Sequence, residues 1–424
     1  MGAIADLLRD VSVPEMVPVR QIFDDTHIET IDIPGTVRSE MEREVIRDRF
    51  RPGMSVCITA GSRGITNIAL ILRSVAGLLK EWGCAPFIIP AMGSHGGATP
   101  EGQALVLKGY GITEETMGCP VISSMETVVC GKTERGGDVR MDRHAFESDA
   151  IVVVNRVKTH TAFRGPYESG LMKMMAIGLG KQPGAQIIHE NGFKEAGTLI
   201  PEYGKVILRE SPVAFGLAIL ENAYEETLEI RALDRDEIEE VEPRLLEKSR
   251  PYMPRILFDS CDVLIVDRIG KDISGDGMDP NVSGRFAVPF VSGGIDAQRV
   301  AVLDLTEETH GNACGCGLAD VTTRRLFEKM DFEATYPNTI TNTVTGEMKI
   351  PMVMDTDRLA VQLCLKTCTY IDRENPRVIR IRDTGHIEKI FISKAMLEEA
   401  GRTPGIEILG EPEPMKFDEN GNLF

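Results

Sequence analysis

The feature that most constrains the fold is a series of short apolar, β-rich runs, each followed by a turn or loop. Residues 53–60 (GMSVCITA) form the first run, and apolar residues at helical spacing follow it. The second run, at 85–92 (APFIIPAM), precedes a glycine-rich turn and then Thr99-Pro100, where proline at the first helical position indicates a helix start. The unbroken β-branched run at 148–155 is typical of a parallel strand covered on both faces. The first half of the chain therefore reads as a doubly wound α/β domain.

The second half carries a related pattern after a change in composition. The charge-rich stretch at 225–254 ends in prolines and predicts a helix that connects two domains. Beyond it, 255–270 and 297–306 again read as buried strands followed by loops. We therefore expect two α/β domains with mainly parallel sheets and the active site in the crevice between them. The expected boundaries are an N-terminal domain at 1–245, a C-terminal domain at 255–404, and a tail at 405–424 that packs back on the first domain or lies on the surface.

Composition excludes several classes of function. Against 65 acidic residues there are only 47 basic ones, and the resulting formal charge of -18 would repel nucleic acids and anionic membranes. An anionic substrate would need local positive charge. No apolar run is long enough to span a membrane, and the start lacks the pattern of a secretion signal. We expect a cytoplasmic protein.

The cysteines are irregularly spaced. An odd count of nine argues against a disulfide framework and fits a reduced compartment. The close pairs are Cys314 with Cys316 and Cys364 with Cys368, and neither has the double CxxC pattern of a zinc site. Buried structural thiols are the favoured interpretation of both pairs.

Polar side chains follow three of the predicted strands. Ser62 and Arg63 come after the first strand, His95 after the second, and Lys158 and His160 after the third. Ligands of open parallel sheets bind beyond the carboxyl ends of the strands, so these groups are expected to face one crevice.

Histidine is scarce, with seven in the chain. A lone loop histidine more often only bonds nearby backbone, but two at strand ends suggest proton transfer near neutral pH. Downstream, the glycine-rich segment 160–189 carries Lys173, Lys181 and His189. Its amides and lysines could hold a phosphate-bearing cofactor. The competing interpretation is a glycine-broken helix with solvated lysines.

Taken together, these residues resemble the nickel-dependent lactate racemases and their racemase and epimerase homologues, over most of the chain. The resemblance rests on SRG with Arg63, AMGSHGGATPEGQ with His95, NRVKTH with His160, and the pair Lys173 and His189. The sixteen-residue spacing of that pair is the most specific signal.

The resemblance implies a covalent nickel-pincer nucleotide, pyridinium-3-thioamide-5-thiocarboxylic acid mononucleotide with nickel. Lys173 would carry it and His189 would bind the metal, because nickel accepts soft sulfur and imidazole ligands in a square-planar site. Further contacts to the cofactor would come from Ser62, Arg63, Gly96 and Gly97. Cofactor-biosynthesis enzymes would then be partners of this chain, which could also be a homo-oligomer.

The implied reaction is racemisation or epimerisation of a small 2-hydroxy acid by reversible hydride transfer, through a keto acid. His95 and His160 would be the two acid/bases, because inversion needs a proton acceptor for each enantiomer.

The sequence departs from the lactate enzymes at several points. Lys181 rivals Lys173 as the attachment site, and the loop from His160 to Lys173 is longer than expected. Ala60 stands where those enzymes carry an aspartate, and the only tryptophan, Trp82, lies in the first domain. We therefore expect a 2-hydroxy acid other than lactate.

A loop at 270–285 replaces the tyrosine, glutamine and lysine motif of the lactate racemases. Its polar residues are Lys271, Asp272, Asp276, Asp279, Asn281 and Arg285. The spacing does not match an EF-hand, and a turn-rich surface loop is the plain alternative. Lys271, like Arg63, is the expected contact to the substrate carboxylate, since an acidic protein that binds an acid needs a local cation.

Two other functions compete with a racemase. One is a non-catalytic or redox metal-binding protein of the same fold that uses the close cysteine pair. The other is a nicotinamide dehydrogenase, which is disfavoured because no GxGxxG follows a strand with an acidic residue about twenty positions on.

Overall fold

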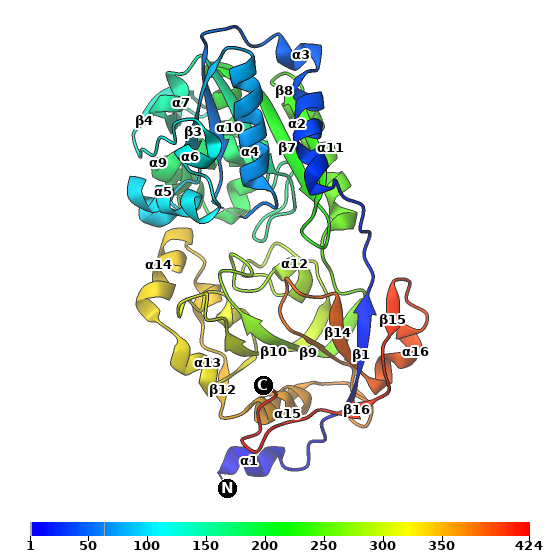
Figure 1. Cartoon of the computed structure of the whole chain (residues 1–424). Helices are drawn as coiled ribbons and strands as arrows, with labels where there is room; N and C mark the ends of the chain where they lie inside the picture. Colours follow the sequence, from blue (N-terminus) through cyan, green and yellow to red (C-terminus); the bar gives the residue numbers. More distant parts are fainter. Residues whose placement is uncertain (1, 63) are drawn as a thin grey trace. The chain divides into compact units, whose positions relative to one another are not determined.

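The computed structural model describes residues 2–62 and 64–424 and divides the chain into two compact units (Figure 1). The central unit is Asp24–Met253, and the terminal unit combines the residues up to Phe23 with Pro254–Phe424. Each unit is built around its own sheet, with helices packed against it. The predicted fold class of two α/β domains is confirmed. The location of the active site between them stays a prediction.

The sheet of the central unit has the strand order β3-β2-β6-β7-β8. Its strands are β2 (Ser55–Ala60), β3 (Ala85–Pro90), β6 (Ala150–Arg156), β7 (Val213–Glu221) and β8 (Thr227–Asp234). The first four run parallel and β8 is antiparallel to β7. The β-rich runs at 53–60, 85–92 and 148–155 thus form strands close to their expected positions.

Helices cover both faces of this sheet. They are α2 (Ile33–Met41), α3 (Glu44–Arg47), α4 (Ile68–Glu81), α5 (Pro100–Gly109), α6 (Glu114–Met117), α7 (Arg143–Phe146), α8 (Leu171–Lys173), α9 (Lys181–Glu190), α10 (Phe193–Glu210) and α11 (Ile238–Ser249). In β6, Val152 packs in a core shared with α2 and α4, whereas Val153 packs in one shared with α10 and α11. Successive strand residues point to opposite faces, which explains why the run is apolar throughout. A hairpin of β4 (Thr127–Lys132) and β5 (Asp138–Asp142) lies outside the sheet.

The charge-rich stretch at 225–254 is not one helix, as the sequence had suggested. Its first part is strand β8, and only the part from Ile238 is helical. In TLEIRALD the buried Ile230 and Ala232 lie on either side of the exposed Arg231, and their side chains complete the core beside α2 and α4. The period of two is a strand signal that the high charge content obscured.

The sheet of the terminal unit has the order β12-β11-β10-β9-β13-β14-β1-β15, and β16 also pairs with β1. Its strands are β1 (Glu15–Gln21), β9 (Ser260–Ile269), β10 (Asp296–Leu305), β11 (Val321–Thr323), β12 (Met352–Met354), β13 (Val378–Ile381), β14 (Lys389–Ser393), β15 (Ile406–Ile408) and β16 (Glu413–Pro414). The pairs from β12 to β13 are parallel and the remainder antiparallel. Its helices are α1 (Ala3–Leu8), α12 (Pro280–Ser283), α13 (Arg324–Lys329), α14 (Phe332–Asn342), α15 (Asp357–Thr367) and α16 (Leu397–Ala400). Within the described ranges, no helix is long and apolar enough to cross a membrane.

The two ends of the chain depart from the expected boundaries. Strand β1 was assigned to the N-terminal domain, but it pairs with β14 and its Val17 and Val19 are buried in the core of the terminal unit. The tail from 405 supplies β15 and β16, which pair with β1. The tail therefore packs within the terminal unit. This pairing joins residues almost 400 positions apart, which local periodicity does not reveal.

Candidate functional site

The loops that follow β2, β3 and β6 begin at one edge of the central sheet, because these strands are parallel neighbours. After β2, the carbonyl oxygen of Ser62 accepts a 2.7 Å hydrogen bond from the hydroxyl of Tyr110. Arg63, the predicted cofactor and substrate contact, lies outside the described residues. Thr66 anchors the same loop, since its backbone N–H donates to the carboxylate of Glu221 at 2.7 Å. The three loops thus start at the same edge of the sheet, as expected from the sequence. That their polar side chains face one crevice stays a prediction.

His95 is an exposed residue in a tight loop after β3. Gly93, Gly96 and Gly97 in this loop all have positive φ, which glycine adopts without strain. A Cβ at Gly96 would lie 2.6 Å from the backbone of α5, so a larger residue would push the loop away. A Cβ at Gly97 would meet nothing within 4 Å. The cofactor contacts predicted for these glycines stay predictions, and the loop geometry independently requires Gly96.

His160 follows β6 in a half-buried position. Its Nδ1 accepts a 3.0 Å hydrogen bond from the backbone N–H of Ala162. A backbone N–H can only donate, so in the neutral ring the proton lies on Nε2. The ring also stacks on Phe163, with centroids 4.3 Å apart. The structure thus holds the imidazole in one orientation and one neutral tautomer.

The ring of Phe193 contacts the rings of both His160 and His189. Its ring centroid lies 6.1 Å from that of His160 and 5.8 Å from that of His189. The two histidines, 29 positions apart in the chain, therefore contact the same side chain. Two of the predicted site residues, His160 and His189, are thus brought close to one side chain.

Lys173 and His189 lie on helical segments separated by a break. Lys173 ends α8, a π-helical turn spans Met174–Leu179, and α9 then carries His189. Such π-helical turns occur frequently at functional sites. The pKa of His189 is lowered because burial disfavours the charged ring and because the positive charge of Lys173 acts on it. The break therefore leaves the two side chains near enough to interact.

The imidazole of His189 has the property expected of a metal ligand. Its Nδ1 is buried and has no hydrogen-bond partner in the part of the chain that the structure describes. Buried polar atoms are nearly always satisfied, so such an atom points to a ligand. The lowered pKa keeps the ring neutral, as coordination requires. These residues fit the nickel-pincer nucleotide, with Lys173 beside the ligand.

Lys181, the rival for cofactor attachment, is fully buried. Its Nζ forms an ion pair with Asp142 at 3.1 Å and donates to the carbonyl oxygen of Pro90 at 2.5 Å. A lysine with this surrounding is not available to a cofactor, whereas Lys173 is half-buried. Of the two lysines, the structure favours Lys173.

Two buried glutamates support the site and were missed by sequence reasoning. Glu168 accepts the backbone N–H of His160 at 2.7 Å and pairs with Arg250 at 3.1 Å. Glu242 of α11 accepts the backbone N–H of Met172 at 3.0 Å and so caps the helix that carries Lys173. Glu242 has the helical spacing of the buried face of α11, which also contains Leu245, and that spacing is the signal that could have found it.

In the terminal unit, Lys271 follows β9 and its Nζ donates to the carbonyl oxygen of Gly275 within its own loop. Asp272 accepts the hydroxyl of Thr306 at 2.6 Å, and Asp279 accepts the backbone N–H of Asn281 at 2.8 Å. The loop is thus held by hydrogen bonds within itself and by one to Thr306, which follows β10. Its predicted contact with a substrate stays a prediction.

The close cysteine pairs are buried free thiols. Burial raises the pKa of Cys314 and of Cys316 to about 12, and that of Cys368 to about 11. It raises the pKa of Cys364 further. Metal binding needs the thiolate, which these surroundings disfavour. Throughout residues 2–62 and 64–424, no three or more His, Cys, Asp or Glu side chains gather in a way that could hold a metal ion.

The turn after β13 carries a histidine that sequence reasoning also missed. The Nδ1 of His386 lies 2.8 Å from the carboxylate of Asp383, which is buried while the ring is exposed. The same carboxylate accepts the backbone N–H groups of Gly385 and His386, so its contacts are those of a turn.

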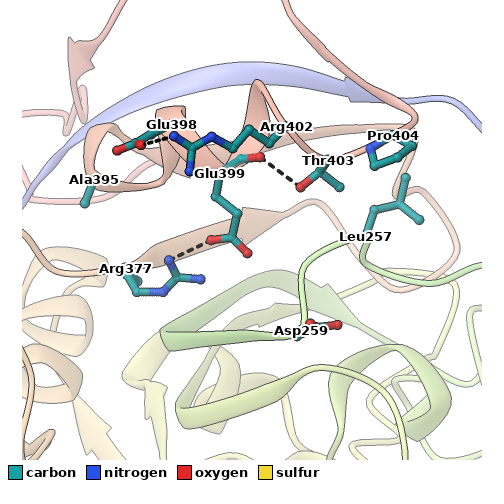
Figure 2. Close-up of a pocket in the computed structure, with 9 residues that line it drawn as sticks. All are labelled: Leu257, Asp259, Arg377, Ala395, Glu398, Glu399, Arg402, Thr403 and Pro404. Carbon is teal, nitrogen blue, oxygen red and sulfur yellow. Dashed lines mark hydrogen bonds and ion pairs between the residues drawn. The ribbon is translucent and has the colours of Figure 1, made fainter.

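A surface pocket of the terminal unit is lined by Leu257, Asp259, Arg377, Ala395, Glu398, Glu399, Arg402, Thr403 and Pro404 (Figure 2). Figure 2 shows Arg377 paired with Glu399 and Arg402 paired with Glu398. The two cations are thereby neutralised. None of the predicted site residues lines this pocket.

Comparison with known proteins finds a family model that matches part of the chain. The family model of the lactate racemase N-terminal domain matches residues 19–197. Among solved structures, the lactate racemase apoprotein from Thermoanaerobacterium thermosaccharolyticum is similar, with 12% identity and a TM-score of 0.43 over 69% of this chain and 74% of that chain. A protein from Thermotoga maritima shows 14% identity and a TM-score of 0.47 over 66% of this chain and 72% of that one. No curated protein matches the sequence. The matched range contains His95, His160, Lys173 and His189, so the part of the chain that carries these candidate residues is similar to the N-terminal domain of lactate racemases.

Proposed function

We propose that this protein is a nickel-pincer-nucleotide-dependent racemase or epimerase of a small 2-hydroxy acid. One observation carries the proposal: the buried, unpartnered Nδ1 of His189 lies in a segment where Lys173 influences its ring and Phe193 joins it to His160. A purely structural histidine would be expected to have a hydrogen-bond partner at that nitrogen. The family match over residues 19–197 supports the same conclusion.

Lys173 and His189 would hold the cofactor, the first by a covalent bond through its amine and the second through its Nδ1. When bound, the nucleotide supplies a group that accepts and returns a hydride. Ser62, Gly96 and Arg63 are the further residues proposed to contact it. Such a chain depends on cofactor-biosynthesis enzymes for its activity.

His95 and His160 are proposed to move the hydroxyl proton of the substrate, each serving one enantiomer. In the tautomer fixed by Ala162, the Nε2 of His160 donates a hydrogen bond to a substrate oxygen. To take up a proton at Nε2, the ring must change tautomer and lose the contact with Ala162. His95 is an exposed residue of its own loop.

The substrate is proposed to be a 2-hydroxy acid other than lactate, because the loop at 270–285 and Ala60 depart from the lactate racemase pattern. Lys271 is the proposed contact to its carboxylate. Chiral chromatography of a hydroxy-acid panel, with protein loaded with cofactor, tests this. Fast racemisation of lactate with little activity on the other acids would contradict it.

The decisive experiment is the intact mass of protein produced together with the cofactor-biosynthesis enzymes. We expect a covalent adduct, stoichiometric nickel, and inversion at carbon 2 of a hydroxy acid. Peptide mapping should place the adduct on the peptide that contains Lys173. Protein that gains neither adduct nor nickel under conditions that load a known lactate racemase would refute the proposed function. The cysteine-based alternative predicts nickel that is lost on thiol alkylation without any adduct.

A further inference from the structure

A buried polar network surrounds Lys181. Its Nζ lies 2.5 Å from the carbonyl oxygen of Pro90, 3.1 Å from Oδ2 of Asp142 and 3.5 Å from Oε1 of Gln103. The side chains of Lys181, Asp142 and Gln103 are all buried. Burying a charge is costly unless the charge is paired, and these three contacts supply the partners that the buried amine needs.

Gln103 connects this lysine to the His95 loop. Its Nε2 donates to the carbonyl oxygen of Gly93 at 2.9 Å and to that of His95 at 3.1 Å. The one amide therefore bonds Lys181 through its oxygen and the loop through its nitrogen. The loop in turn lies against the helical segment, since a Cβ at Gly93 would come within 3.2 Å of Ile177.

Lys181 also stands where the helix breaks. Its φ of 53° is left-handed, an uncommon conformation for a residue other than glycine. Such conformations persist only where the surroundings hold them. Here the buried ion pair and the bond to Pro90 fix the side chain. The break separates Lys173, at the end of α8, from His189 on α9.

From these contacts we propose that Lys181 and Gln103 are positioning residues that fix the His95 loop relative to the segments that carry Lys173 and His189. Neither touches the cofactor or the substrate in this role. The catalytic consequence rests on the proposed function, but the positioning itself does not.

Hydrogen exchange of the protein without cofactor tests the positioning. Gln103→Met removes the donor to Gly93 and His95 while keeping the side-chain volume similar. The loss of one buried and one partly buried hydrogen bond should speed exchange in peptides covering 93–98 by about tenfold or more, with little change elsewhere. The matched control is Gln186→Met on α9, where the amide only bonds the exposed Glu190.

Two further variants separate positioning from general destabilisation. Gln103→Glu keeps an acceptor for Lys181 but replaces the donor to the loop, and it should also speed exchange at 93–98. Lys181→Met combined with Asp142→Asn removes both charges while an oxygen remains to cap Ala145. We expect this pair to speed exchange both in the loop and near residue 181. If the loop exchanges at the normal rate in all three variants, the proposal is wrong.

Kinetics of the loaded enzyme provide a second readout. Displacing His95 without removing a substrate contact should lower kcat by about tenfold or more and leave KM nearly unchanged. A parallel loss of folded protein with normal kcat per folded molecule would show that the network is only structural, and would overturn the proposal. If the loaded wild-type protein lacks racemase activity while the exchange result holds, the proposed function fails and the positioning of the loop stands.

Discussion

Replacing Glu242 with glutamine should remove most of a pH dependence from the stability of the central unit. The carboxyl of Glu242 is buried under α8, where it accepts the backbone N–H of Met172. Burial raises its pKa from an ordinary 4.5 to about 8, although hydrogen bonds from the backbone of Met172 and Leu171 oppose the shift. The folded protein therefore keeps this group protonated at pH values where the unfolded chain has lost the proton.

The sign and size of the effect follow from proton linkage. Between about pH 4.5 and 8 the folded state binds more protons than the unfolded state, so the free energy of unfolding falls as the pH rises. The stabilisation is fully present below about 4.5 and is lost as the pH passes through about 8. At about 1.36 kcal/mol per pH unit, the rise from 4.5 to about 8 sets an upper limit of about 5 kcal/mol. A glutamine keeps an oxygen for the two backbone donors and does not titrate.

Urea denaturation at several pH values from 5 to 8 measures this difference. The wild-type curve should fall more steeply with pH than that of Glu242→Gln. The control is Glu239→Gln on the same helix, whose exposed side chain forms a surface ion pair with Lys205 at 2.7 Å, and whose curve should follow the wild type. If wild type and Glu242→Gln run parallel over the whole range, Glu242 is ionised in the folded state and the reasoning is refuted.

Other predictions concern the cofactor and the histidines. Lys173→Ala should abolish the covalent adduct seen by mass spectrometry. Lys181→Met should retain the adduct in the folded fraction of the protein. It should also lower the free energy of unfolding in urea titrations by about 3–5 kcal/mol, because Asp142 is left unpaired. An adduct that persists without Lys173 would remove that assignment. His189→Ala should retain the adduct and lose nickel by elemental analysis, and unchanged nickel would exclude it as a ligand. His95→Ala and His160→Ala should each lower racemisation in both directions by roughly 10²–10⁴-fold, and near-normal turnover in folded variants would make both histidines structural.

The strands that position the site could be predicted from sequence because their signal is local. β2, β3 and β6 are short runs of residues that suit a sheet covered on both faces, and glycine or polar loops end them. β1 and β8 could not be placed in the same way. The partner strand of β1 lies about 370 positions away, and the charges of 225–254 resemble a solvated helix.

The residues of the candidate site likewise divide into those that the sequence indicates and those that only the packing reveals. His95, His160, Lys173 and His189 are candidates that residue type and spacing alone can indicate. Glu168 and Glu242 do not, because an acidic residue is usually exposed and only the three-dimensional packing shows that these two are buried. Lys181 was weighed as a cofactor lysine because residue type cannot distinguish a cation that faces a ligand from one that is sealed in the core.

This division has a physical cause. Residues proposed to act on a substrate or to carry a cofactor need an accessible face, and His95 is exposed while Lys173 is half-buried. A buried residue that fixes the position of such a group needs hydrogen-bond or ion-pair partners for its own polar atoms. Glu242 accepts the backbone N–H of Met172, and Lys181 forms an ion pair with Asp142. Removing a buried holder leaves its partner unsatisfied, and the damage spreads to the loop or helix that it anchors. The proposed site residues therefore depend for their geometry on the buried side chains of Glu242 and Lys181, and variants at these two positions should change both stability and rate.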